Sequence, residues 1–107
     1  MTGIGLIGCG MWGRNLARNL AALGVLAGVA DRCPDRAADF AGEFGTSHVP
    51  VNELLAGHDL DGVVIASAAP THAELACRAL DCGLHAFVEK PFALTLAEAD
   101  RMAAAAT

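Results

Sequence analysis

The sequence predicts an α/β fold built on a doubly wound parallel sheet. Short apolar runs rich in valine and isoleucine alternate with longer segments of helical periodicity, which is typical of β-α-β units. The 107 residues suit one compact domain, and no linker or internal repeat divides them. Apolar residues make up 54% of the chain and charged residues 18%, so a packed core is expected rather than disorder.

The first half of the chain predicts three strands, each followed by a helix. The strands are expected at residues 4–7, 25–30 and 48–51. The helices are expected to begin near Trp12, at Pro34, which suits a first helical position, and after Asn52, which can act as a cap. A glycine should end each of these helices: Gly24, Gly45 and Gly57.

The second half predicts two further strands, at residues 63–66 and 84–88. The run at 63–66 is continuously apolar, which favours a central strand buried on both faces. Each of the two helices here should begin at a Thr-x-x-Glu capping box: Thr71 with Glu74, and Thr95 with Glu98. A right-handed crossover after the last helix should return to a sixth parallel strand, which the sequence lacks. We therefore expect one domain over residues 1–107 that lacks its last strand.

Residues 8–13 form a G-x-G-x-x-G motif between the first expected strand and the first expected helix. The pattern alone is common, but its place after a strand and before a helix predicts a dinucleotide-binding site. Gly8 permits a tight turn, Gly10 lets the main chain approach a pyrophosphate, and Gly13 allows the helix to pack closely on the strand. The free N–H groups at the helix start would receive the phosphates. No Walker A lysine follows, so nucleotide hydrolysis is not indicated.

Asp31 ends the second expected strand, about 20 residues after the glycines, where an acid accepts hydrogen bonds from a ribose diol. Its negative charge would repel a 2′-phosphate, which favours NAD over NADP. The neighbouring Arg32 could pair with that phosphate or stack on adenine, so NADP stays the alternative.

Several polar segments follow the carboxyl ends of strands and should meet at one edge of the sheet, where open α/β sheets bind ligands. They are the glycine loop, Asp31, the segment 67–72 with Ser67, Pro70 and His72, and the pair Glu89-Lys90. Glu89 and Lys90 would then face the nicotinamide end of the cofactor. The alternative for this pair is an exposed ion pair that contributes little to stability.

Taken together, these residues resemble the N-terminal half of the Gfo/Idh/MocA oxidoreductases. The resemblance covers essentially the whole chain and is carried by the loop at residues 8–13, the stretch 66–100 and above all Glu89-Lys90-Pro91. The glycine loop and the segment 71–76, Thr-His-Ala-Glu-Leu-Ala, look most like the branch that acts on nucleotide-linked sugars. The fold implied is a Rossmann domain followed, in the family, by a larger C-terminal α/β domain that this chain lacks.

The resemblance also implies roles for individual residues. Lys90 matches the family's lysine near the nicotinamide and the substrate hydroxyl, so it is the candidate catalytic residue. Glu89 would contact the nicotinamide ribose or steady Lys90, and Pro91 would fix the turn, with a cis bond as one way to do so. His72 would border the cofactor, although a lone histidine at a helix start is often only a cap or a solvated residue. Two loop residues, Met11 and Trp12, are further candidates for cofactor contact, or they only shape the loop.

The implied function is that of the cofactor domain of an NAD(P)-dependent oxidoreductase. Such an enzyme transfers a hydride between NAD(P) and a secondary alcohol of a sugar or sugar-nucleotide substrate. Without the family's second domain, the isolated chain should bind cofactor more readily than it turns over. One alternative is a stand-alone nucleotide-binding or sensing module without chemistry. Another is a piece that forms a homo-oligomer through the open edge of strand 84–88.

Composition excludes other classes of function. The formal net charge of −5 and the pI of about 5.1 argue against a nucleic-acid partner. No apolar run reaches the roughly 20 residues that span a bilayer, so we expect a soluble, cytoplasmic protein. Neither the four cysteines nor the four histidines show metal-ligand spacing, so no metal is expected, and His48, His58 and His85 should be structural or exposed.

Overall fold

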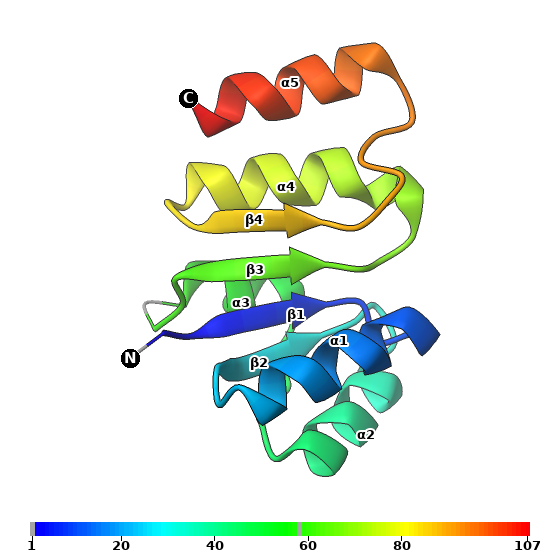
Figure 1. Ribbon diagram of the computed structural model, residues 1–107, viewed down its shortest axis with the longest axis vertical. Coiled ribbons are helices and arrows are strands. Elements are labelled where there is room, and N and C mark those ends of the chain that lie inside the picture. Colours follow the sequence, from blue (N-terminus) through cyan, green and yellow to red (C-terminus); the bar gives the residue numbers. More distant parts are fainter. Residues whose placement is uncertain (1, 58) are drawn as a thin grey trace.

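A computed structural model describes residues 2–57 and 59–107; the expectation for His58 therefore lies outside the described residues. Figure 1 shows one parallel sheet in the order β2-β1-β3-β4. Its strands are β1 (Ile4–Ile7), β2 (Leu26–Ala30), β3 (Gly62–Ile65) and β4 (His85–Val88). The helices are α1 (Met11–Ala22), α2 (Pro34–Phe44), α3 (Val51–Ala56), α4 (His72–Asp81) and α5 (Leu96–Ala106), with a 3₁₀ turn η1 (Ala69–Thr71) before α4.

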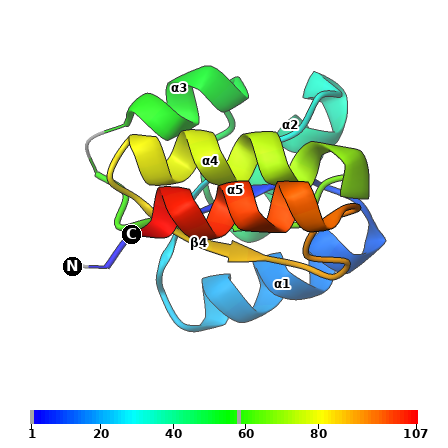
Figure 2. The same ribbon diagram turned by 90° about the horizontal axis from the view of Figure 1, so that it is seen from above.

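The sheet separates two apolar clusters, which confirms the doubly wound α/β architecture. On one face, α1 and α2 pack against Leu6 and Val29, and both strand side chains are fully buried. On the other face, α3, α4 and α5 cover Val63 and Ile65, and α5 contributes Met102. Figures 1 and 2 show α5 lying along α4. Burial on both faces explains why β3 is a continuous apolar run.

The direction in which successive strands are added to the sheet reverses between β1 and β3. The chain moves from β1 to β2 on one side and then returns to the other side of β1 to form β3. The register aligns the carboxyl ends, since Ile7 pairs with Ala30 and Ile65, and Ile65 pairs with Val88. The residues that follow these strands therefore come together along one edge of the sheet.

The prediction of a strand over residues 48–51 is wrong in its length. Only His48 pairs, through an isolated parallel bridge with Val29, and α3 begins at Val51. Pro50 has no N–H for a ladder and stands at the N-cap of α3 instead. Asn52 is therefore not the cap; it lies inside α3, where its Oδ1 accepts a hydrogen bond from Arg78.

Of the two expected capping boxes, only the one at Thr95 makes its threonine bond, and its glutamate bonds the residue before the cap. Thr95 accepts a hydrogen bond from the N–H of Glu98, and the Glu98 carboxylate accepts one from the N–H of Leu94. Thr71 makes no cap, because its own backbone is already helical and its hydroxyl is used in the preceding turn. None of the helices in residues 2–57 and 59–107 is long and apolar enough to cross a membrane.

Candidate functional site

Gly8 occupies the point where strand order reverses. Its φ is 108°, in the region that favours glycine, and it directly follows β1. A Cβ at this position would lie 2.5 Å from the carbonyl carbon of Ala66 and 2.5 Å from the nitrogen of Ser67. The loop after β1 and the loop after β3 therefore touch here through main-chain atoms, and only glycine fits.

Gly13 and Gly10 serve different purposes. A Cβ on Gly13 would lie 2.2 Å from the carbonyl oxygen of Gly8, so glycine is needed for α1 to pack on the end of β1. A Cβ on Gly10 would meet nothing within 4 Å, although Gly10 is the N-cap of α1. Packing within the chain explains why residue 13 is a glycine, but it does not explain why residue 10 is one. The space in front of Gly10 is open to a ligand.

The N-terminus of α1 is suited to an anion. Gly10 offers no side-chain cap, and the first turn of the helix carries no acidic residue. The N–H groups of a helix start together with the helix dipole attract phosphate groups. The open space at Gly10 and this helix start fit the pyrophosphate of a dinucleotide.

Asp31 is held by several donors just after β2. Its Oδ1 accepts from the N–H of Cys9 at 2.9 Å, and its Oδ2 accepts from the N–H of Cys33 at 2.8 Å and from both Nε and Nη2 of Arg36. The side chain is 8% exposed. Burial opposes ionisation of Asp31, but the hydrogen bonds from Cys9, Cys33 and Arg36 outweigh it, so the pKa is lowered. Asp31 is thus a carboxylate that ties the glycine loop to the start of α2.

Arg36 is a site residue that sequence reasoning missed. It lies in the first turns of α2, and its Nη2 is 2.9 Å from Oδ2 of Asp31. The signal in the sequence was its distance of five residues from Asp31 across a turn with Pro34 at the first helical position. Such a turn brings the helix start back beside the strand end.

A cavity of about 440 Å³ opens at this edge. Five of the residues expected from the sequence line it: Gly8, Gly10, Asp31, Arg32 and Ser67. Nine more line it that the sequence did not single out as site residues, although Ala68 and Thr71 lie within the expected segment 67–72: Ile7, Arg36, Val51, Ala66, Ala68, Thr71, Glu74, Leu75 and Arg78. The loops after β1, β2 and β3 and one side of α4 therefore enclose a single cavity next to the glycine loop.

The hydroxyl of Ser67 has a defined orientation in the cavity wall. The Thr71 hydroxyl lies 2.6 Å from the carbonyl oxygen of Ala68 and must donate to it, because a carbonyl only accepts. Ser67 Oγ lies 2.7 Å from Thr71 Oγ1, so Ser67 is the donor of that second hydrogen bond. The lone pairs of Ser67 Oγ stay available to accept from a ligand hydroxyl or amine.

Glu89 and Lys90 begin the turn after β4 and do not line this cavity. The N–H of Glu89 donates to the carbonyl oxygen of Ile65, which extends the pairing with β3 by one residue. Lys90 is exposed, and the Lys90–Pro91 peptide bond is cis. Among the described residues the ion pairs are Arg14–Glu43 and Arg36–Asp31, so the alternative of an ion pair between Glu89 and Lys90 is not seen.

His72 lies beneath the turn after β4 rather than in solvent. Its side chain is 1% exposed, which excludes the solvated alternative. Nδ1 lies 2.7 Å from the carbonyl oxygen of Pro91, and Nε2 lies 2.8 Å from the carbonyl oxygen of Ser67. Both ring nitrogens thus face main chain of the protein.

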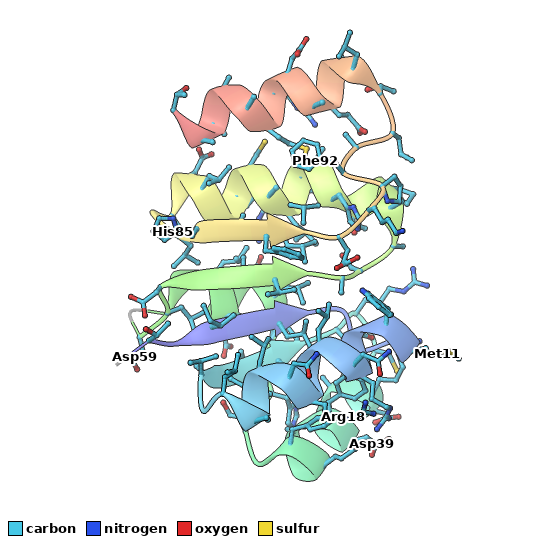
Figure 3. The ribbon with its side chains drawn as sticks, in the orientation of Figure 1. Met11, Arg18, Asp39, Asp59, His85 and Phe92 are labelled. Carbon is cyan, nitrogen blue, oxygen red and sulfur yellow. The ribbon has the colours of Figure 1, made fainter. Side chains whose placement is uncertain are left out.

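The remaining candidates lie around the cavity without lining it. Met11 is 89% exposed and Trp12 56% exposed at the start of α1, and Pro70 is exposed in η1. In Figure 3, Met11 lies at the edge formed by the carboxyl ends of the strands, whereas His85 and Asp59 lie at the opposite edge. His85 and His48 are exposed, as expected.

Cys9, inside the glycine loop, is a buried structural thiol. Burial and, to a lesser degree, the charge of Asp31 raise its pKa to about 12. Its Sγ lies 3.7 Å from the carbonyl oxygen of Ala30. The four cysteines are free thiols.

A parallel sheet with a glycine loop at its switch point and an acid after β2 defines the class of dinucleotide-binding α/β domains. Comparison with known proteins places the chain within that class. The model of the Gfo/Idh/MocA family, described as an oxidoreductase family with an NAD-binding Rossmann fold, matches residues 2–107. The chain belongs to this family.

Curated relatives and solved structures agree with this placement. A UDP-N-acetylglucosamine 3-dehydrogenase from Acidithiobacillus ferrooxidans is 41% identical over 99 residues, covering 92% of this chain and 31% of the relative. An inositol 2-dehydrogenase from Acidothermus cellulolyticus is 38% identical over 99 residues, covering 88% and 29%. The 3-ketoreductase KijD10 from Actinomadura kijaniata, solved with NADP and TDP-benzene, superposes with a TM-score of 0.91 at 33% identity, covering 98% and 34%. The chain therefore spans about a third of the length of the relatives it matches.

Proposed function

We propose that this chain binds NAD(P) as the cofactor domain of an oxidoreductase that acts on a secondary alcohol of a sugar or sugar nucleotide. The observation that carries the proposal is Gly10, a glycine that no contact within the chain requires, at an uncapped helix start beside the cavity. Family membership and the names of the relatives support both the cofactor and the substrate class.

Different residues would bind different parts of the cofactor. The loop from Gly8 to Gly13 and the start of α1 would hold the pyrophosphate. Asp31 would accept from the ribose of the adenosine half, and Ser67 would offer its lone pairs from the other wall. Glu89 and Lys90 would serve the nicotinamide end, outside the cavity. The cofactor supplies the hydride chemistry when bound, whereas Lys90 orients the hydroxyl of the substrate.

We propose NAD as the preferred cofactor and NADP as the alternative. The lowered pKa of Asp31 keeps a negative charge where a 2′-phosphate would sit. Two arginines, Arg32 and Arg36, line the same cavity as Asp31, and their positive charges would favour that phosphate. Arg36 is already paired with Asp31, so Arg32 is the free guanidinium of the two.

The test is a titration of the 107-residue chain with NADH and with NADPH. Trp12 is the only tryptophan and lies two residues after Gly10, in the first turn of α1, so quenching of its fluorescence reports on the site. We expect saturable binding that favours NADH and that Gly10→Ala weakens at least about tenfold, since a Cβ would enter the path of the pyrophosphate.

Gly42→Ala is the matched control, because a Cβ there also meets nothing within 4 Å but Gly42 lies in α2. It should leave binding unchanged. Equal affinity in the Gly10→Ala chain, or no binding by a chain shown to be folded, would contradict the proposal. In a longer protein that carries this domain, unchanged turnover by Lys90→Ala would show that the assignment of Lys90 as the catalytic residue is wrong.

A further inference from the structure

His72 is the one polar or charged residue that is fully buried within residues 2–57 and 59–107. Its ring makes no side-chain hydrogen bond there; both nitrogens lie against main-chain carbonyl oxygens. Burying a polar ring is costly unless its hydrogen bonds are made, so this placement needs both partners.

The two residues whose carbonyl oxygens face the His72 ring lie in different loops at the carboxyl edge of the sheet. Ser67, whose carbonyl oxygen faces Nε2, follows β3 and lines the cavity. Pro91, whose carbonyl oxygen faces Nδ1, follows Lys90 in the turn after β4. The imidazole ring of His72 therefore bridges the wall of the cavity and the turn that carries Lys90.

The bridge anchors the part of the turn where sheet pairing has ended. The last ladder bond runs from the N–H of Glu89 to Ile65, and the next bond along the described chain is donated by the N–H of Leu94 to Glu98. Between them, Pro91 is held through its contact with His72. Both contacts of His72 are with carbonyl oxygens, which only accept, so each contact is a hydrogen bond when the facing ring nitrogen carries the hydrogen.

We propose that His72 is a positioning residue, which sets the place of Lys90 relative to the cofactor cavity through Ser67 and Pro91. The inference rests on the proposed function, because it assumes that Lys90 serves the nicotinamide end. His72 acts without touching cofactor, in the way that a supporting shell of hydrogen bonds fixes a site.

The first test needs no cofactor. An asparagine amide can replace Nδ1 and keep a donor for Pro91, whereas a glutamine amide can replace Nε2 and keep a donor for Ser67. In His72→Gln we expect the backbone order parameters of Lys90 and Phe92, measured by ¹⁵N relaxation, to fall from about 0.85 to below about 0.6. His72→Asn should keep them near the wild-type value, and His85→Gln, at an exposed histidine of β4, is the matched control. Unchanged order in His72→Gln would overturn the proposal.

The second test follows Lys90 itself, the only lysine of the chain. Reductive methylation with ¹³C gives Lys90 its own NMR signal, and Trp12 quenching reports independently on the other half of the site. With NADH, we expect both responses in the wild type, and in both His72 variants quenching with a smaller shift of the Lys90 signal. His72→Asn carries this test even if His72→Gln does not fold.

The outcomes separate the two proposals. If the folded wild-type chain shows no quenching, the proposed function fails, and the relaxation data alone decide whether His72 holds the turn. If quenching occurs and the Lys90 signal shifts equally in all chains, the proposed function stands and His72 is not a positioning residue.

Discussion

Asp31 links the stability of this domain to pH. Its pKa in the folded chain is below the unfolded value of about 3.9, because hydrogen bonds from Cys9, Cys33 and Arg36 outweigh burial. A carboxyl group whose pKa is lowered by folding stabilises the folded state. This stabilisation is fully present at pH values above the pKa of the unfolded chain, and it is lost as the pH falls through the pKa of the folded chain.

We therefore expect Asp31→Asn to flatten the pH dependence of unfolding. The wild-type urea midpoint should fall more steeply than that of the variant between about pH 5 and pH 2. Asp39→Asn, which removes an exposed carboxylate from α2, is the control and should follow the wild type. Parallel curves for wild type and Asp31→Asn would show that the hydrogen bonds at Asp31 do not stabilise the folded state.

We expect alanine at Gly13 and alanine at Gly42 to change the free energy of unfolding in opposite directions. Gly13→Ala should lower the free energy of unfolding by about 1–3 kcal/mol, because its Cβ would lie 2.2 Å from the carbonyl oxygen of Gly8. Gly42→Ala meets nothing within 4 Å in α2 and should raise it by about 0.5–1 kcal/mol through helix propensity. Urea denaturation measures both, and a neutral Gly13→Ala would mean that α1 can move away from β1.

At the scale of elements, the two Thr-x-x-Glu sequences differ in what their threonines do. Thr95→Ala removes the bond to the N–H of Glu98 and should cost about 1 kcal/mol, with faster amide exchange along α5. Thr71→Ala should leave the amide exchange of α4 unchanged, because Thr71 does not cap that helix. Equal effects on both helices would contradict the assignment.

The sequence predicted the elements well where a local pattern decided them. Apolar runs located four strands, and glycines marked the ends of α1, α2, α3 and α4. It failed at residues 48–51, where a valine-proline-valine pattern looks extended but Pro50 supplies no donor and starts α3 instead. It also failed at Thr71, because the spacing of a capping box does not reveal that an earlier turn has used the hydroxyl.

The site could be predicted to the level of segments but not of contacts. The sequence brought the glycine loop, Asp31 and Ser67 to one edge, since parallel strands share the direction of their carboxyl ends. It could not show that Arg36 pairs with Asp31 or that His72 bridges Ser67 and Pro91. Those contacts depend on the angle between elements, which no local pattern encodes.

At the scale of the whole molecule, one sheet supports both apolar clusters. Leu6 and Ile65 are fully buried on opposite faces, so truncating either to alanine should cost about 2–5 kcal/mol. We expect each variant to unfold in one transition that coincides by circular dichroism and by NMR across both layers. Loss of the α3, α4 and α5 signals before those of α1 and α2 in Ile65→Ala would show that the layers unfold separately.

For anyone who redesigns cofactor choice in this domain, Asp31 is not an independent position. An alanine there would free the amides of Cys9 and Cys33 and leave the guanidinium of Arg36 without its counter-charge. The glycine loop would loosen at the same moment as the charge at the proposed ribose position changed, and a loss of affinity would be misread as a change of preference. A redesign should therefore keep an oxygen acceptor at this position, such as asparagine or serine, and alter charge at Arg32.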